Sequence, residues 1–178
     1  MNKLQITSDW TLFLDRDGVI NKKIENGYVL SPDDLEFLPG VFPFLAEAAN
    51  LFQKIIVVTN QQCIGKGLLT VEALNEINSY ILNFVELNGG RIDAVYFAPD
   101  LAGEYNTLRK PATGMAELAK ADFPEINFEK SLMIGDSLSD MQFGKVLGMT
   151  TIFLNAEKVK SDLIDFKSGS WKDILELF

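Results

Sequence analysis

The fold is decided by the stretch Leu12-Phe13-Leu14-Asp15-Arg16-Asp17-Gly18-Val19-Ile20. Its first three residues continue an apolar run that predicts a buried β-strand over Thr11–Leu14, and this run stops at two acids separated by one residue. A buried strand that ends in this way delivers both carboxylates to the rim of a sheet, where a metal ion and a phosphate group can reach them. We interpret the stretch as a site, and specifically as a catalytic one.

Length and composition limit the other possibilities. The chain has 178 residues, 47% of them hydrophobic, so we expect residues 1–178 to form one domain with a core that excludes water. Its 16 basic and 25 acidic residues give a formal charge of −9, which disfavours nucleic acids and anionic membranes as partners. Neither a signal peptide nor a membrane-spanning stretch is recognised, so we expect a cytoplasmic protein, as a monomer or weak homo-oligomer.

The scarcity of soft ligands restricts any metal site. The chain contains a single cysteine, Cys63, and no histidine, so neither an internal disulfide nor the usual nitrogen and sulfur zinc sites can form. A bound metal is therefore expected to have oxygen ligands. Because Cys63 has no histidine as a base, we interpret it as a partly buried thiol and not as a nucleophile.

Short apolar runs alternate with helical patterns along the chain. The predicted strands are Thr11–Leu14, Ile55–Val58, Ala94–Phe97, Leu132–Ile134 and Thr151–Leu154. The predicted helices lie over 41–52, 71–84, 111–122, 139–147 and 171–178. This alternation predicts an α/β fold, a three-layer Rossmann-like parallel sheet with helices on both faces, whose ligands gather beyond the carboxyl ends of the strands.

Polar residues follow four of these strands. In chain order they are Asp15 and Asp17; Thr59, Asn60 and Gln61; Arg109 and Lys110; and Asp136, Ser137 and Asp140. Phosphoryl transfer needs acids, a hydroxyl and cations of this kind, because the reacting group carries negative charge that must be neutralised as a nucleophile approaches. Each group alone could be a turn or a helix cap, but their joint position after strands of one sheet favours the catalytic interpretation.

The order of the strand ends assigns the catalytic roles. Asp15, at the strand terminus, is predicted to be the nucleophile that forms an aspartyl-phosphate. Asp17 is predicted to protonate the leaving oxygen and then to activate water. Thr59 and Lys110 are predicted to hold the phosphoryl group, and Arg109 to bind a second anionic group of the substrate.

The acids also predict a magnesium site. Mg²⁺ that bridges Asp15, Asp136 and a phosphate oxygen would cancel the repulsion between carboxylate and phosphate. Asp140 is expected to support this site, or Lys110, from the second shell of contacts. A calcium-binding EF-hand loop also opens with Asp-x-Asp-Gly, but it is disfavoured here because two apolar residues follow.

These groups resemble the four motifs of the haloacid dehalogenase (HAD) superfamily over about residues 11–155, as Asp15-x-Asp17, Thr59, Lys110 and Asp136 with Asp140. One branch of that superfamily contains D-glycero-D-manno-heptose-1,7-bisphosphate phosphatases and histidinol-phosphate phosphatases. The stretches similar to this branch are 15–21, 27–29, 59–67 and 109–111. The resemblance implies an HAD-like fold and Mg²⁺ held by Asp15, Asp136 and the backbone carbonyl of Asp17.

Substrate contacts are expected on the loops around the same edge of the sheet. The predicted contacts are Glu25, Asn26, Gly27, Tyr28, Asn60, Gln61, Gln62, Lys66, Arg109 and Ser137. The loop at 25–28 suits sugar hydroxyls, and Lys66 with Arg109 suits a second phosphate; the alternative is a solvated loop with a stray lysine. No segment is long enough for a cap domain, so we expect an open site.

One departure from the branch concerns zinc. Its members typically carry a loop of three Cys and one His before the Arg-Lys-Pro motif, and residues 98–108 contain neither residue type. We therefore expect no structural zinc, and a substrate-contacting surface that differs from that of the branch.

Together, these observations favour a Mg²⁺-dependent phosphatase of a small phosphorylated sugar or metabolite. The specific prediction is the 7-phosphate of D-glycero-D-manno-heptose 1,7-bisphosphate, with histidinol phosphate or another sugar phosphate as the alternative substrate. A phospho-accepting receiver-like signalling module also forms an aspartyl-phosphate on a parallel sheet, but it would lack a second acid placed like Asp17. A catalytically idle binding protein is disfavoured by the intact acid pair.

Overall fold

The computed structural model describes residues 3–103, 108–155 and 159–178, and these contain one six-stranded sheet. All neighbouring strands are parallel, in the order β3-β2-β1-β4-β5-β6. The strands are β1 (Thr11–Leu14), β2 (Lys54–Asn60), β3 (Ala94–Ala98), β4 (Ser131–Gly135), β5 (Thr150–Leu154) and β6 (Phe166–Ser168).

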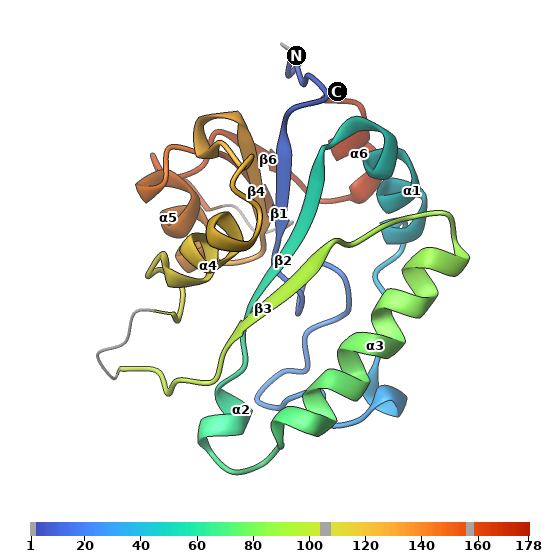
Figure 1. The fold of residues 1–178 in the computed structure, drawn as a ribbon, viewed down its shortest axis with the longest axis vertical. Coiled ribbons are helices and arrows are strands. Elements are labelled where there is room, and N and C mark those ends of the chain that lie inside the picture. The colour runs from blue at the N-terminus through green and yellow to red at the C-terminus, as the bar shows by residue number, and fades with distance from the viewer. Residues whose placement is uncertain (1–2, 104–107, 156–158) are drawn as a thin grey trace.

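Helices cover both faces of this sheet, as Figure 1 shows. On one side lie α1 (Val41–Leu51), α3 (Val71–Leu87) and α6 (Trp171–Leu175), and on the other lie α4 (Gly114–Asp122) and α5 (Leu138–Val146). Shorter elements are α2 (Gln62–Gly65) and the 3-10 turns η1 (Pro32–Asp34) and η2 (Phe128–Lys130). The predicted three-layer α/β architecture is confirmed.

The hydrophobic core has two parts because successive strand side chains point to opposite faces of the sheet. Leu12 and Leu14 belong to the part that includes residues of α1, α3 and α6. Phe13 belongs to the part that includes Met115 of α4 and Phe143 of α5. All four residues of β1 are buried, which explains why its sequence is apolar without a polar alternation.

The strand order places β1 between β2 and β4. From β1 the chain first moves outward through β2 and β3, and then returns to the other side of β1 to form β4, β5 and β6. Connections therefore leave β1 and β4 in opposite directions, and such a reversal opens a crevice beyond the carboxyl ends of the two strands. Asp15 and Asp136 follow these two strands directly.

The loop after β1 carries no inserted cap domain. Residues 15–40 contain η1 and two isolated β-bridges, Asp17–Asn21 and Asn21–Phe37, which join parts of this loop to one another before α1 begins. Within the part of the chain that is described, no helix is long and apolar enough to cross a membrane.

The predicted elements are confirmed in place, with corrections at their ends. The helix predicted from Pro111 begins at Gly114, because Ala112 N donates to the Arg109 carbonyl and the chain turns before Thr113 caps the helix. The helix predicted to reach Phe178 ends at Leu175. Two short elements, α2 with four residues and β6 with three, are not predicted from the sequence.

Candidate active site

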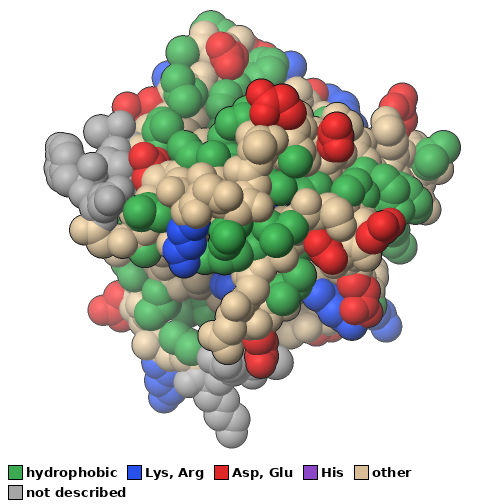
Figure 2. Space-filling view, turned by 90° about the horizontal axis from the view of Figure 1, so that it is seen from below, with side chains coloured by type: hydrophobic (Ala, Val, Ile, Leu, Met, Phe, Trp, Pro, Cys, Tyr) green, Lys and Arg blue, Asp and Glu red, His purple; other side chains and the backbone are tan. Residues whose placement is uncertain are grey.

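A cavity of about 220 Å³ opens at the carboxyl ends of the strands. Figure 2 views the molecule from this end, where hydrophobic, acidic and basic side chains are intermixed at the surface. The predicted site residues that line the cavity are Asp15, Asp17, Gly27, Tyr28, Thr59, Asn60, Gln61, Gln62, Arg109, Lys110, Asp136, Ser137 and Asp140. Five separate stretches of the chain thus contribute to one cavity.

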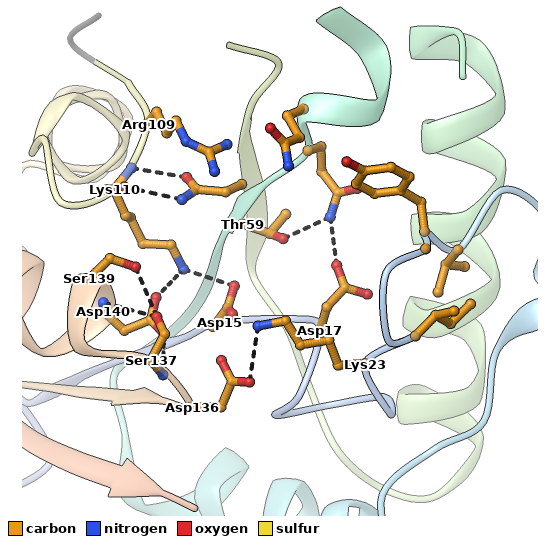
Figure 3. A pocket seen from close by; sticks show the side chains of 17 residues that line it. Asp15, Asp17, Lys23, Thr59, Arg109, Lys110, Asp136, Ser137, Ser139 and Asp140 are labelled. Atoms are coloured by element: carbon orange, nitrogen blue, oxygen red, sulfur yellow. Dashed lines mark hydrogen bonds and ion pairs between the residues drawn. The ribbon is translucent and has the colours of Figure 1, made fainter. Parts of the chain in front are cut away.

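Lys110 lies at the centre of the site and is 3% exposed. Its Nζ lies 2.8 Å from Asp15 Oδ1, 2.6 Å from Asp140 Oδ1 and 2.7 Å from the Val58 carbonyl oxygen (Figure 3). Burial lowers the pKa of Lys110, but Asp140 and Asp15 outweigh this effect and raise it above its ordinary value. The side chain is therefore a fixed positive charge beside the end of β1.

The backbone of Lys110 is held by Asn60 at the end of β2. Lys110 N donates to Asn60 Oδ1 at 2.9 Å, and Asn60 Nδ2 donates to the Lys110 carbonyl at 3.1 Å. This reciprocal pair ties the segment before α4 to β2. Asn60 lines the cavity, but its amide is engaged in positioning Lys110.

Asp17 is held by side chains on several sides. Arg16 Nη2 donates to both Asp17 carboxylate oxygens at 3.0 and 2.9 Å, and Asn21 Nδ2 donates to Oδ1 at 2.9 Å. Gln61 Nε2 donates to Asp17 Oδ2 at 2.8 Å and to the Thr59 hydroxyl at 2.9 Å. Burial raises the pKa of Asp17, but Arg16 and the hydrogen bonds outweigh it and the pKa lies below its ordinary value.

Three carboxylates, of Asp15, Asp136 and Asp140, form what we call the acidic cluster. Each offers an oxygen atom, and these atoms all lie within 4.8 Å of one another. Asp136 Oδ1 is buried and has no hydrogen-bond partner among the described residues. An all-oxygen donor set with such an unsatisfied atom fits a hard divalent cation such as Mg²⁺.

The electrostatics of the cluster agree with this fit. Burial, opposed by Lys110 and reinforced by Asp140, raises the pKa of Asp15 to about 7. Burial also raises the pKa of Asp136, although Lys23 opposes it. A divalent cation among these oxygens would favour their charged forms. The Asp17 side chain is outside the cluster, so the predicted role of Asp17 toward the metal falls on its backbone carbonyl alone.

Two glycines allow the acids to approach one another. Gly18 has φ +94°, and a Cβ atom there would lie 2.2 Å from Asp136 Oδ2. At Gly135, the last residue of β4, a Cβ atom would lie 2.2 Å from the Asp140 Cβ. Any larger side chain at either position would displace a carboxylate of the acidic cluster. This explains why a glycine follows the second acid of Asp-x-Asp-Gly.

Asp140 is positioned by the first turn of α5. Ser137 is the N-cap, and Asp140 Oδ2 accepts hydrogen bonds from Ser137 N at 3.0 Å and from Ser137 Oγ at 2.5 Å. This capping box leaves Oδ1 to face Lys110. The geometry agrees with the expectation that Asp140 supports Lys110.

The loop after β1 differs from the prediction. Glu25, Asn26 and Lys66 do not line the cavity, whereas Lys23 does. Asn26 has φ +54°, so the chain turns there, and Lys66 Nζ instead donates to the Tyr28 hydroxyl at 2.7 Å.

The cavity is also lined by Ile24, Val29 and Ser139, which, like Lys23, are not predicted from the sequence. The signal for Lys23 was a basic residue shortly after the acid pair. Part of the loop in which zinc ligands were sought, residues 104–107, lies outside the described residues.

The chain is similar in sequence to known hydrolases. A family profile described as HAD-hydrolase-like matches residues 107–169. The chain is 36% identical over 160 residues to a D-glycero-β-D-manno-heptose-1,7-bisphosphate 7-phosphatase of Helicobacter pylori, covering 89% of this chain and 84% of the relative. It is 38% identical over 173 residues to a D-glycero-α-D-manno-heptose-1,7-bisphosphate 7-phosphatase of Campylobacter jejuni, covering 94% of each.

Solved structures show the same fold. The fold is similar to that of the D,D-heptose 1,7-bisphosphate phosphatase from B. bronchiseptica complexed with magnesium and phosphate, with a TM-score of 0.83 and 23% identity over 94% of this chain and 98% of that one. The corresponding enzyme from Burkholderia thailandensis gives a TM-score of 0.63 and 27% identity over 93% and 98%. By its curated relatives, the chain belongs to the D-glycero-D-manno-heptose-1,7-bisphosphate 7-phosphatase family of HAD-like hydrolases.

Proposed function

We propose that the protein is a Mg²⁺-dependent phosphatase that removes the 7-phosphate of D-glycero-D-manno-heptose 1,7-bisphosphate through an aspartyl-phosphate. The observation that carries the proposal is the meeting of Asp15, Lys110 and the acidic cluster in one cavity, in a chain whose relatives bear that name. Asp15, Asp136 and the Asp17 carbonyl would hold Mg²⁺, which neutralises charge on the phosphoryl oxygens when bound.

In the first step, an Asp15 carboxylate oxygen attacks the phosphorus atom and the bond between phosphorus and the sugar oxygen breaks. The leaving oxygen takes a proton from Asp17, which Gln61 and Arg16 hold in place. Thr59 and Lys110 bind the phosphoryl oxygens and the charge that develops on them.

In the second step, water attacks the phosphorus atom of the aspartyl-phosphate. Asp17 accepts a proton from this water, the bond between phosphorus and Asp15 breaks, and inorganic phosphate leaves with the Asp15 carboxylate restored. The lowered pKa of Asp17 keeps its carboxylate charged in the free protein, so the proton that Asp17 donates in the first step has to arrive with the substrate.

The specificity is tested by phosphate release from a panel that contains both anomers of the heptose 1,7-bisphosphate, histidinol phosphate and several sugar monophosphates. We expect Mg²⁺-dependent turnover with a preference for the heptose bisphosphate, and loss of turnover in chelator. Because the relatives carry both α and β names, both anomers must be compared. A preference for histidinol phosphate would overturn the proposed substrate but would leave the proposed phosphatase mechanism in place.

The nucleophile is tested by Asp15→Asn, which keeps the shape of the side chain but removes its carboxylate. We expect no measurable turnover on any substrate of the panel and an unchanged far-UV circular dichroism spectrum. Turnover in a folded Asp15→Asn protein would overturn the assignment. Covalent labelling without turnover in the parent protein would instead support the receiver-like alternative.

A further inference from the structure

Lys23 is a cation at the acidic cluster that the proposed mechanism does not use. Its Nζ lies 3.3 Å from Asp136 Oδ2, and Figure 3 shows it reaching toward this carboxylate from the loop after β1. Asp15 and Asp140 also act on Lys23 electrostatically. The Lys23 ammonium therefore contacts Asp136 and lies in the negative field of the other two carboxylates of the cluster.

Lys23 and Lys110, the two lysines at the cluster, differ in how freely their side chains can move. Lys110 is buried, and its ammonium contacts two carboxylates and a carbonyl oxygen. The Lys23 side chain is 60% exposed, and among the described residues Asp136 is the acid to which it is paired at ion-pair distance. The Lys23 ammonium can therefore leave the cluster while Lys110 stays.

The backbone around Lys23 is held, so such a movement would involve the side chain. Lys22 N donates to the Glu36 carbonyl at 2.7 Å, and Asn21 forms a β-bridge with Phe37. These contacts attach the start of the loop to the segment before α1. A long, exposed lysine side chain on a held backbone can swing away from Asp136 without unfolding the loop.

Charge decides what happens when a divalent cation arrives. Three carboxylates outnumber the two ammonium groups, so the cluster keeps a surplus of negative charge. A divalent cation bound by Asp15 and Asp136 would share the Asp136 carboxylate with Lys23, and two cations at such short distances repel each other. One of the two cations must then leave the carboxylate, and the exposed Lys23 ammonium is the one that water can solvate.

We propose that Lys23 competes with Mg²⁺ for Asp136 and so raises the concentration of Mg²⁺ needed to fill the site. The inference rests on the proposed function, in which the acidic cluster holds the metal. Lys23 acts here on the affinity for the metal and has no assigned part in the chemical steps.

The test is a calorimetric titration of MgCl₂ into chelator-treated, substrate-free protein at neutral pH and fixed ionic strength. We expect Lys23→Gln to lower the Kd for Mg²⁺ by about three- to tenfold, as removal of a partly exposed competing charge implies. Lys23→Arg keeps the charge and should keep the Kd of the parent protein. The rise in Tm caused by a fixed Mg²⁺ concentration should be larger in Lys23→Gln than in the parent.

Lys22→Gln is the matched control. It makes the same change in net charge one residue away, but Lys22 is paired with Glu36 and does not line the cavity. Its Kd for Mg²⁺ should stay within about twofold of the parent value, because exposed charges outside the site are well screened.

The outcomes separate the inference from the function on which it rests. An unchanged or higher Kd in Lys23→Gln, with the parent protein binding Mg²⁺ and Asp136→Asn failing to bind it, overturns the role of Lys23 and leaves the metal site in place. A parent protein that binds no Mg²⁺ overturns the proposed metal dependence itself, and the inference with it.

Discussion

At the residue scale, Arg16 connects the catalytic acid pair with the core. Its guanidinium is buried, contacts both Asp17 oxygens and lies 3.4 Å from Asn78 Oδ1 on α3. A planar fork of this kind fixes the orientation of a carboxylate as well as its charge. The residue between the two acids of Asp-x-Asp therefore has a structural task of its own.

We expect Arg16→Lys to lower kcat by about 10- to 100-fold, because a lysine offers a point charge and leaves the Asp17 carboxylate less well oriented. Steady-state phosphate release measures the effect, with circular dichroism to show that the variant folds. Asn78→Ala is the control, since it removes only the long contact and should change kcat by less than about threefold. An unchanged kcat in folded Arg16→Lys would mean that Asn21 and Gln61 alone orient Asp17.

Residues at strand ends can be located from the sequence more closely than residues on loops. Asp15, Thr59 and Asp136 lie at or directly after buried strands, whose apolar pattern fixes where they end. The loop after β1 has no such pattern, and Lys23 lines the cavity whereas Glu25 does not. The sequence of a polar loop does not show which of its side chains point inward.

At the element scale, Asp165 joins α5 to the start of β5. Its carboxylate pairs with Lys145 on α5 and accepts hydrogen bonds from Thr151 N at 2.9 Å and Thr151 Oγ1 at 3.1 Å. Burial raises the pKa of Asp165, but Lys145 and Thr151 together outweigh it and hold the pKa below its ordinary value of 3.8.

We expect Asp165→Ala to lower the free energy of unfolding by about 1 kcal/mol at neutral pH. Because the pKa of Asp165 is lower in the folded than in the unfolded chain, its contribution is complete above pH 3.8 and is lost as the pH falls through the folded value. Urea unfolding at several pH values should therefore show the two proteins converging in acid.

Asp162→Ala is the control for this experiment, since Asp162 is an exposed acid in the same segment. Its free energy of unfolding should stay within about 0.5 kcal/mol of the parent at every pH. A constant difference between Asp165→Ala and the parent down to strong acid would contradict the electrostatic explanation.

The elements that could be predicted are those with a long or strongly apolar pattern. The first strand was predicted at its observed bounds, because all of its residues are buried. The edge strand β6 has three residues, one of them the exposed Lys167, and α2 is a single turn, so neither has a periodicity to recognise. The strand β6 pairs with the neighbouring β5, and α2 lies at the rim of the cavity.

At the scale of the whole molecule, the last helix supports the loop of the first motif. Trp171 Nε1 donates to the Val19 carbonyl at 3.2 Å, and its ring lies 4.1 Å from that of Phe44, centroid to centroid. Val19 follows Asp17 by two residues. Side chains from opposite ends of the chain thus share the packing beneath the candidate active site.

We expect Trp171→Phe to lower the free energy of unfolding by about 1–2 kcal/mol, because the ring contact with Phe44 remains but the buried Val19 carbonyl loses its donor. Trp171→Ala should cost about 3–5 kcal/mol, since it also leaves a cavity. Chemical denaturation measures both. Equal losses in the two variants would mean that the indole N–H bond contributes nothing and that ring volume accounts for the whole effect.

The parallel sheet could be predicted from the alternation of strands and helices, but the strand order could not. Neighbours such as β1 and β4 are separated by more than a hundred residues, and no local pattern in either strand names its partner. The general behaviour of such sheets nonetheless predicts that a site lies at the carboxyl edge, because every parallel strand ends there, and the cavity opens at this edge.

The burial of Lys110 has a chemical consequence. Reagents that acylate amines need a neutral, accessible nitrogen, whereas this ammonium is 3% exposed, carries a raised pKa and is surrounded by three oxygen acceptors. The lysine at the centre of the site should therefore be the slowest of the described lysines to react. The rate at which Lys110 is acylated would then depend on how often the site opens. This rate would therefore measure local unfolding around the end of β1.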